Sequence, residues 1–299
     1  MIISKLLEEK RNKITVSSLL TLIKFRLSLA ITISAVTGWL LSSGTGINRL
    51  SMLCSGIFFL TAGSAVLNQY TERDLDAKMQ RTSRRPIVKN VISGKTALAI
   101  LSLLITIGSL LLLAAGTVPF ILGLSGIFLY NILYTNLKKL TFLAIIPGAL
   151  VGSIPPLIGY TAAGGNIFEE KILFFSAFMF LWQIPHFLLL LIRYGNEYQY
   201  AGFRTLYDFA GVSQIRKITL VWIVISSLLL GFYLFVLSAF SLLFSSLFSS
   251  VTGIYIFFMF FGLTAVKSSG DNKKIFMLFN IYSFLIMILL AVTSITNTL

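Results

Sequence analysis

Long apolar stretches, separated by shorter polar ones, run through this chain of 299 residues. A helix needs roughly 20 apolar residues to cross a bilayer, and nine stretches have about that length. We expect the spans near 19–43, 50–70, 94–115, 117–135, 141–163, 170–192, 214–240, 244–266 and 274–297. The boundary between the seventh and eighth spans is the least sharply marked. The pattern predicts an all-α fold, a polytopic membrane bundle of about nine helices.

The composition supports this class. The chain is 57% hydrophobic and 11% charged, with a mean hydropathy of +0.91, whereas soluble domains are about 45–50% apolar and about 25% charged. No polar segment is long enough to fold alone, so residues 1–299 are expected to form one integral-membrane domain. The single cysteine, Cys54, lies within an apolar span, which excludes a disulfide within the chain.

The basic residues fall on one side of the nine-span arrangement. Of the 24 Lys and Arg residues, all but Arg49 and Lys171 lie in alternate connections on that side. Cytoplasmic loops carry such an excess of positive charge. We therefore expect a multi-pass protein of the cell membrane in which residues 1–18, 71–93 and 193–213 are cytoplasmic and the C-terminus is outside. The net charge of +14 then reflects topology and gives no reason to expect nucleic acid as a partner.

Three of the ten acids of the chain stand together directly after the second span. If the helix continues, Asn68, Glu72 and Asp76 recur every four residues on one face, and a small distortion would let Asp74 join them. Their oxygens suit Mg²⁺, which takes one or two protein carboxylates and completes its shell with water and phosphate. The cluster predicts a magnesium and diphosphate site, and an exposed ion network at a loop end is the alternative.

Basic side chains that could bind phosphate follow the acids. Arginine binds phosphate oxygens bidentately and lysine binds them as a point charge. The candidates are Lys78, Arg81, Arg84 and Arg85. For each of them the alternative is an ordinary contribution to the charge asymmetry of the loops.

A second polar cluster closes the sixth span, around Trp182, His186 and Glu197. His186 is the sole histidine of the chain; it could bind a metal or transfer a proton, or it could be a satisfied polar side chain. Eleven residues of continuous helix separate it from Glu197, roughly 16 Å at 1.5 Å per residue. The two side chains could not share one ion, but they could bind opposite ends of one large substrate.

A weak internal repeat and a Pro/Gly-rich segment complete the pattern. Glu72 and Glu197 lie four spans apart, which suggests two four-helix halves followed by a ninth helix, an arrangement that transporters also use. Residues 147–159 contain three prolines and three glycines. This segment either packs tightly through Gly148-x-x-x-Gly152 or lines a cavity.

These residues resemble the UbiA superfamily of intramembrane prenyltransferases and, within it, the heme O synthases. The matching segments are Asn68–Thr82 with its Met-x-Arg-Thr ending, Arg85-Pro86, Tyr134-Thr135 with Leu137-Lys138, Gly148–Gly159, Trp182-x-x-Pro185-His186-Phe187 and Glu197-Tyr198-x-x-Ala201-Gly202. Together they extend from about residue 24 to residue 211.

The sequence also departs from the pattern. Ala201 stands where the wider superfamily often has a second acid, and Asp208 is the nearby acid that could replace it. Arg204 and Tyr207 stand where heme O synthases usually have prolines, and Phe25 replaces an expected proline. The absence of an acid at position 201 resembles the heme O synthases more than the quinone-type members of the superfamily.

The resemblance implies transfer of a farnesyl group from farnesyl diphosphate to a vinyl group of heme b, with Mg²⁺ as cofactor. The implied catalytic and metal-binding residues are Asn68, Glu72, Asp76 and Glu197, assisted by Arg81 and Lys138. The implied substrate-binding residues are Asp74, Lys78, Arg85, Tyr130, Tyr134, His186, Phe187, Tyr194 and Tyr198. The implied partners are farnesyl diphosphate, heme b, membrane lipid, and a heme A synthase or terminal oxidase that would receive the product.

Two alternatives stay open. A UbiA-type enzyme that prenylates an aromatic quinone precursor would share the diphosphate site but would not need His186 to face heme. A secondary transporter or lipid carrier would use the acids to couple ions. Formation of a prenylated product distinguishes an enzyme from a carrier.

Overall fold

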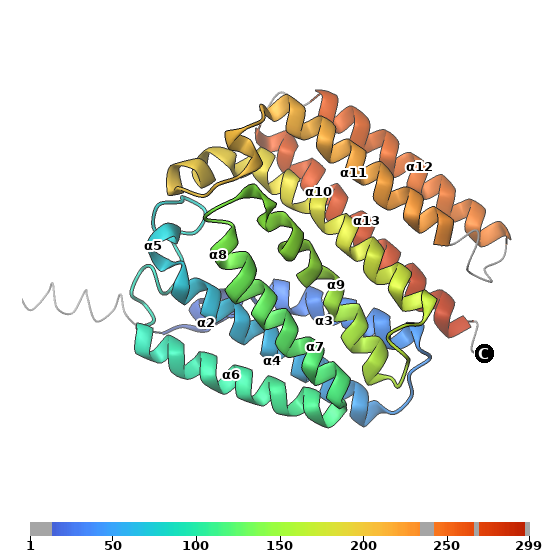
Figure 1. The fold of residues 1–299 in the computed structure, drawn as a ribbon, viewed down its shortest axis with the longest axis horizontal. Helices are drawn as coiled ribbons and strands as arrows, with labels where there is room; N and C mark the ends of the chain where they lie inside the picture. Colours follow the sequence, from blue (N-terminus) through green and yellow to red (C-terminus); the bar gives the residue numbers. More distant parts are fainter. Residues whose placement is uncertain (1–13, 234–241, 266–268, 297–299) are drawn as a thin grey trace, which may run out of the picture.

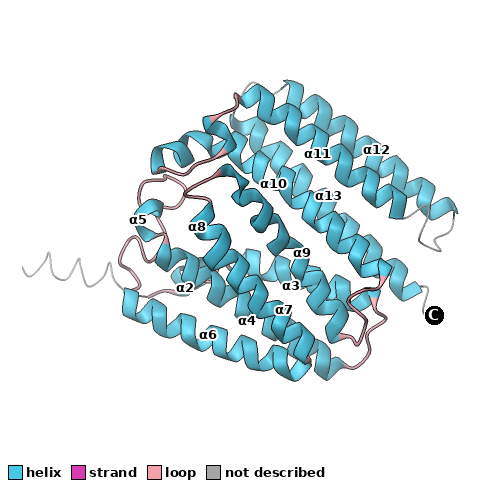
Figure 2. Cartoon of the chain, viewed as in Figure 1, coloured by secondary structure: helices cyan, strands magenta, loops and turns pink. Residues whose placement is uncertain are grey.

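The computed structural model describes residues 14–233, 242–265 and 269–296, and these residues form helices, turns and loops without a strand (Figures 1 and 2). The first half contains α2 (Val16–Leu22), α3 (Phe25–Leu41), α4 (Ile47–Thr71), α5 (Arg73–Asp76), α6 (Gly94–Ala115), α7 (Thr117–Ile127), a π-helix (Phe128–Tyr134) and α8 (Thr135–Leu137). The second half contains the 3-10 turn Phe142–Ala144, α9 (Ile145–Ala162), α10 (Glu170–Ala201), the 3-10 turn Leu206–Asp208, α11 (Val212–Phe232), α12 (Leu242–Ala265) and α13 (Ser269–Thr296).

The expected all-α membrane architecture is confirmed. Eight helical segments of the described chain are long and apolar enough to cross a membrane, and a ninth is added if α2 and α3 form one span. These two helices meet at an angle of 52°, so the first expected span is broken rather than straight. The break lies at Lys24, whose backbone is left-handed with a φ of 46°.

The sixth expected span is longer than the hydrophobic pattern indicated. Residues 193–201, expected to begin a loop, form the last turns of α10. Gly195 lies within the helix and gives room to a neighbouring ring, because an added Cβ would lie 2.3 Å from an atom of Tyr207. The helix ends at Gly202, which adopts the left-handed conformation common after helix C-termini.

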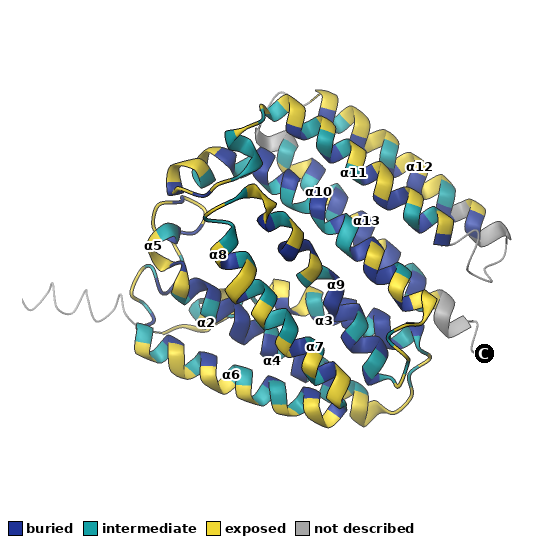
Figure 3. Cartoon of the chain, viewed as in Figure 1, coloured by how far each residue is buried: buried dark blue, intermediate teal, exposed yellow. Residues whose placement is uncertain are grey.

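Two packed groups of helices make up the bundle (Figure 1). Helices α3, α4, α6, α7 and α9 share one buried cluster, and α10, α11, α12 and α13 share a larger one. Contacts of α10 with α9 and of α13 with α3 join the groups. The outer faces carry exposed apolar side chains such as Leu110 and Leu228, as expected where helices meet lipid (Figure 3).

Close contact between α3 and α9 explains part of the Pro/Gly-rich segment. A Cβ on Gly159 would lie 1.7 Å from the Ala35 carbonyl oxygen, and one on Gly38 would lie 2.0 Å from the Pro156 carbonyl oxygen. Glycine is therefore required on both helices at this crossing. Gly148, in contrast, faces the rings of Tyr134 and Phe187, each 3.0 Å from an added Cβ.

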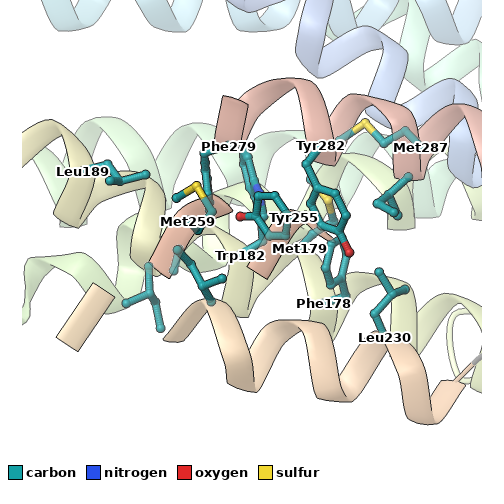
Figure 4. Close-up of a cluster of buried hydrophobic side chains, with 14 of the residues drawn as sticks. Phe178, Met179, Trp182, Leu189, Leu230, Tyr255, Met259, Phe279, Tyr282 and Met287 are labelled. Atoms are coloured by element: carbon teal, nitrogen blue, oxygen red, sulfur yellow. The ribbon is translucent and has the colours of Figure 1, made fainter. Parts of the chain in front are cut away.

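Aromatic side chains fill the core between α10, α12 and α13 (Figure 4). Trp182 stacks on Phe279 with ring centroids 4.8 Å apart, and Tyr255 stacks on Tyr282 at 3.8 Å. The Tyr282 hydroxyl is also hydrogen-bonded to Thr252, with 2.9 Å between the oxygens. These contacts attach α13 firmly to the rest of the second group.

Candidate active site

The three polar residues expected on one helical face are brought together where α4 ends. The Asn68 amide donates to Glu72 Oε2 at 2.9 Å, and a slight break at Glu72 leads into α5, which carries Asp76. All three side chains are buried, with exposed fractions of 2%, 4% and 1%. Asp74 points away, with a side chain that is 90% exposed and paired with Arg73.

Each buried carboxylate has its own basic partner. Lys138 Nζ, which follows α8, lies 2.7 and 2.8 Å from the two carboxylate oxygens of Glu72. Arg85, from the loop after α5, forms an ion pair with Asp76. Burial raises the pKa of the Asp76 carboxyl, and the Arg85 charge opposes this shift.

Lys24 is a third basic residue of the site, and it was not expected there from the sequence. Its ammonium donates to Asn68 Oδ1 at 3.1 Å from the left-handed break between α2 and α3. A lysine within an apolar span was the available signal, because such a residue needs a polar partner in the bundle. The basic side chains of Lys24, Arg85 and Lys138 together outnumber the two buried carboxylates, which suits the site to binding a further anion.

The loop after α5 also contacts the end of α10. The Arg81 backbone N–H donates to Glu197 Oε2 at 3.1 Å, and the guanidinium donates to the Tyr198 hydroxyl at 2.9 Å. The same guanidinium lies over the ring of Tyr194, 4.9 Å from its centroid. Glu197 thus lies at the same end of the bundle as the acids of α4 and α5. Lys78, by contrast, is exposed.

Aromatic rings form an apolar wall beside the cations. Tyr130 and Tyr134, both in the π-helix, stack with centroids 5.6 Å apart, and Phe187 of α10 lies 5.7 Å from Tyr134. Lys138 Nζ lies 5.0 Å from the centre of the Tyr134 ring. A π-helix is rare and often occurs at functional sites. Here it places two tyrosines on the side that faces Lys138.

His186 occupies a different face of α10 from Phe187. Its ring lies 5.2 Å from Trp182 and 5.1 Å from Phe276 of α13, measured between centroids. Its Nδ1 is buried and has no hydrogen-bond partner among the described residues, and the Asn280 side chain interacts with the imidazole. His186 is therefore packed toward α13, not toward the Tyr134 wall, and its expected contact with heme stays a prediction.

Donor chemistry at the site fits a divalent cation that also binds phosphate. In the described part of the chain, no group of three or more His, Cys, Asp and Glu side chains is placed to hold a metal ion by itself. Mg²⁺, however, commonly needs one or two carboxylates when a phosphate completes its shell. The buried oxygens of Asn68, Glu72 and Asp76 supply such donors, so these residues fit the ion.

The chain is similar to one protein family and to individual proteins named as prenyltransferases. The model of the UbiA prenyltransferase family matches residues 29–284. A protoheme IX farnesyltransferase of Geobacter sulfurreducens is 40% identical over 183 residues, which cover 61% of this chain and 68% of the relative. A protoheme IX farnesyltransferase of Listeria welshimeri is 32% identical over 242 residues, which cover 78% of this chain and 79% of the relative.

Solved structures share the fold at low sequence identity. The structure of a digeranylgeranylglyceryl phosphate synthase has a TM-score of 0.75 at 17% identity, covering 94% of this chain and 99% of the other. A UbiA homolog from Archaeoglobus fulgidus, bound to GPP and Mg²⁺, has a TM-score of 0.67 at 15% identity, covering 93% and 99%. At these identities the likeness concerns the fold of the bundle.

Proposed function

The chain belongs to the UbiA prenyltransferase family, and on this basis we propose that it transfers a farnesyl group from farnesyl diphosphate to a vinyl group of heme b. The allylic C–O bond breaks and diphosphate leaves. A new C–C bond forms at the terminal vinyl carbon, water adds a hydroxyl to the neighbouring carbon, and a proton is released. The protoheme IX farnesyltransferases that match the chain support heme b as the acceptor.

One observation carries the proposal: three basic side chains surround two buried carboxylates at the end of a membrane helix. Lys24, Arg85 and Lys138 contact Asn68, Asp76 and Glu72, respectively. Negative charge grows on the diphosphate as the C–O bond breaks, and preorganised cations stabilise charge where it develops. A diphosphate would bind between these side chains and weaken their internal ion pairs.

Mg²⁺ is the metal that suits this donor set. Asn68, Glu72, Asp76 and Glu197 would hold it, and when bound it would neutralise part of the charge of the leaving diphosphate. Arg81 already connects Glu197 to the loop that carries Arg85. Glu197 would contribute its carboxylate from α10, across from the acids of α4 and α5.

The aromatic wall suits the other product of bond cleavage. Aromatic faces attract cations, and an allylic cation needs a pocket from which water is excluded. Tyr134 and Phe187 offer such faces beside Lys138, and Tyr130 extends the wall. Tyr194 and Tyr198 lie against Arg81, where they would cover the diphosphate end.

A quinone-type acceptor is the second candidate, because His186 is packed toward α13. If heme b is the acceptor, we propose that His186 orients the porphyrin from the α13 side, through an imidazole whose Nδ1 has no partner in the part of the chain that the structure describes. The product would then pass to a heme A synthase or terminal oxidase. The site would open to the cytoplasm, where farnesyl diphosphate is soluble.

Mass spectrometry of hemes tests the activity. The purified full chain, in lipid nanodiscs with Mg²⁺, farnesyl diphosphate and heme b, should produce heme O and diphosphate. An aromatic quinone precursor supplied in a parallel reaction should remain unmodified. A prenylated quinone precursor without heme O would support the second candidate, and absence of both products would refute prenyl transfer.

A further inference from the structure

Two hydrogen bonds join α4 to the π-helix one turn deeper in the bundle than Asn68. The Ser64 hydroxyl donates to Asn131 Oδ1 at 2.5 Å, and Asn131 Nδ2 donates to the Ser64 carbonyl oxygen at 2.9 Å. Both residues are buried. Neither residue was expected at the site from the sequence.

This pair is the first of three contacts that α4 and the residue that caps it make with the continuous segment from the π-helix through α8 to Lys138. One turn further along α4, Asn68 Nδ2 lies 3.5 Å from Thr135 Oγ1. One turn beyond that, Glu72 pairs with Lys138. We call these three contacts, Ser64 with Asn131, Asn68 with Thr135 and Glu72 with Lys138, the polar ladder. Its second and third contacts contain Asn68 and Glu72, which belong to the proposed active site.

The position of Asn131 within the π-helix gives the first contact its importance. Each α-helical residue turns the chain by about 100°, and a π-helical turn contains more residues than an α-helical one. If this segment changed between the two forms, every following side chain would rotate about the helix axis. Lys138, seven residues after Asn131, would then no longer face Glu72.

We propose that Asn131 and Ser64 form a positioning pair that fixes the register of the π-helix on α4 and thereby holds Lys138 against Glu72. The same register stacks Tyr130 on Tyr134. The pair acts through Lys138 and contacts no reacting atom. Its effect on diphosphate binding rests on the proposed function, whereas its effect on the position of Lys138 does not.

The rival explanation is that these bonds only strengthen helix packing, as hydrogen bonds between membrane helices commonly do. The bundle offers a matched control. Thr252 of α12 and Tyr282 of α13 form a buried hydrogen bond between two helices of the other packed group. Thr252→Val removes a hydroxyl from that bond as Ser64→Ala does from the ladder.

The position of Lys138 can be followed without any ligand. In the purified full chain, lysines are converted to ¹³C-dimethyl-lysine, and the NMR signal of Lys138 is assigned from its loss in Lys138→Arg. Ser64→Ala and Asn131→Leu should move this signal, and Thr252→Val should leave it in place. An unchanged signal in Ser64→Ala would overturn the proposal, even if Asn131→Leu fails to fold.

Binding of inorganic diphosphate in the presence of Mg²⁺ gives the second measurement. Ser64→Ala should weaken binding about ten-fold, because small errors in position are costly at charged sites. The same substitution in a Lys138→Met background should cause no further loss, whereas an additive loss would contradict action through Lys138. If the wild type binds no diphosphate, the proposed function fails, and the NMR signal still decides the role of the ladder.

Discussion

The ammonium of Lys24, at the break between α2 and α3, donates a hydrogen bond to Asn68 Oδ1 of α4 at 3.1 Å. This contact connects the first membrane span to the residue that begins the acid cluster. It also places a second basic side chain next to the Asn68–Glu72 pair, which Lys138 contacts from the end of α8. The bend of the first span therefore has a direct consequence for charge at the site.

Lys24→Met should weaken binding of farnesyl diphosphate while preserving the length of the side chain. A hydrogen bond to a charged group contributes about 1.5–3 kcal/mol, which corresponds to about a ten-fold or larger increase in KM. Steady-state kinetics of purified protein measure this change. Lys95→Met, at an exposed position near the start of α6, is the control and should leave KM unchanged. Equal KM values for the Lys24 variant and the wild type would remove Lys24 from the site.

Glu72→Gln and Asp76→Asn should each lower kcat about 100-fold or more, because each removes a charged oxygen donor with little change in volume. Chelation of Mg²⁺ should abolish turnover of the wild type. Glu170→Gln, at the exposed start of α10, controls for loss of an acid. Near-normal turnover of either site variant at limiting Mg²⁺ would refute the assignment of these carboxylates as metal ligands.

The sequence predicted the parts of the site that depend on local periodicity. Asn68, Glu72 and Asp76 share a face because residues four apart are neighbours on a helix. Lys24 was not assigned, because its partner lies 44 residues away and the apolar run gives no sign of the break. The bond between Ser64 and Asn131 was missed for the same reason: two common polar residues reveal nothing until the fold brings them together.

The ends of elements were harder to predict than their existence. Polar residues after position 192 suggested a loop, but α10 continues to Ala201 because its end packs on the loops of the site. The predicted boundary between the seventh and eighth spans falls close to residues 234–241, which lie outside the described residues. The basic residues before position 14 and Leu299 lie outside them as well, so their placement stays a prediction.

Acid should weaken the connection between α9 and α10 through Glu169. The hydroxyl of Tyr160 and the backbone N–H of Asn166 donate to its carboxylate and hold its pKa below the ordinary value. A lowered folded-state pKa contributes stability above the unfolded pKa, near 4.5, and this contribution is lost as pH falls through the folded value. The Tm difference between wild type and Glu169→Gln should be largest near neutral pH and shrink below about pH 4.5. A constant difference across this range would contradict the linkage.

The orientation proposed from the charge asymmetry can be tested by labelling. In a background in which Cys54 is replaced, single cysteines at Lys89 and Arg204 should react with a membrane-impermeant reagent only from the cytoplasmic face. One at Asn166 should react from outside. All three positions are exposed in loops, so accessibility does not limit the reaction. The reverse pattern would place the acid cluster on the outer face and would contradict a cytoplasmic supply of farnesyl diphosphate.

A variant of His186 distinguishes the heme acceptor from the quinone-type acceptor, because only the heme reaction is proposed to need the imidazole. The ring lies among Trp182, Phe276 and Phe279, and it contributes no contact to the Glu72 and Asp76 cluster described above. Loss of the imidazole should therefore weaken binding of heme b and leave binding of diphosphate unchanged.

His186→Ala leaves a cavity in this aromatic cluster, so His186→Phe is the better variant, since it keeps an aromatic ring and removes both nitrogens. It should lower heme O formation about ten-fold or more, the size of effect expected when a substrate is misplaced, and weaken the Soret shift on titration with heme b. Binding of inorganic diphosphate should stay at the wild-type level, because the Glu72 and Asp76 cluster is untouched. Wild-type heme O production by His186→Phe would show that the imidazole serves only the packing of α13 against α10.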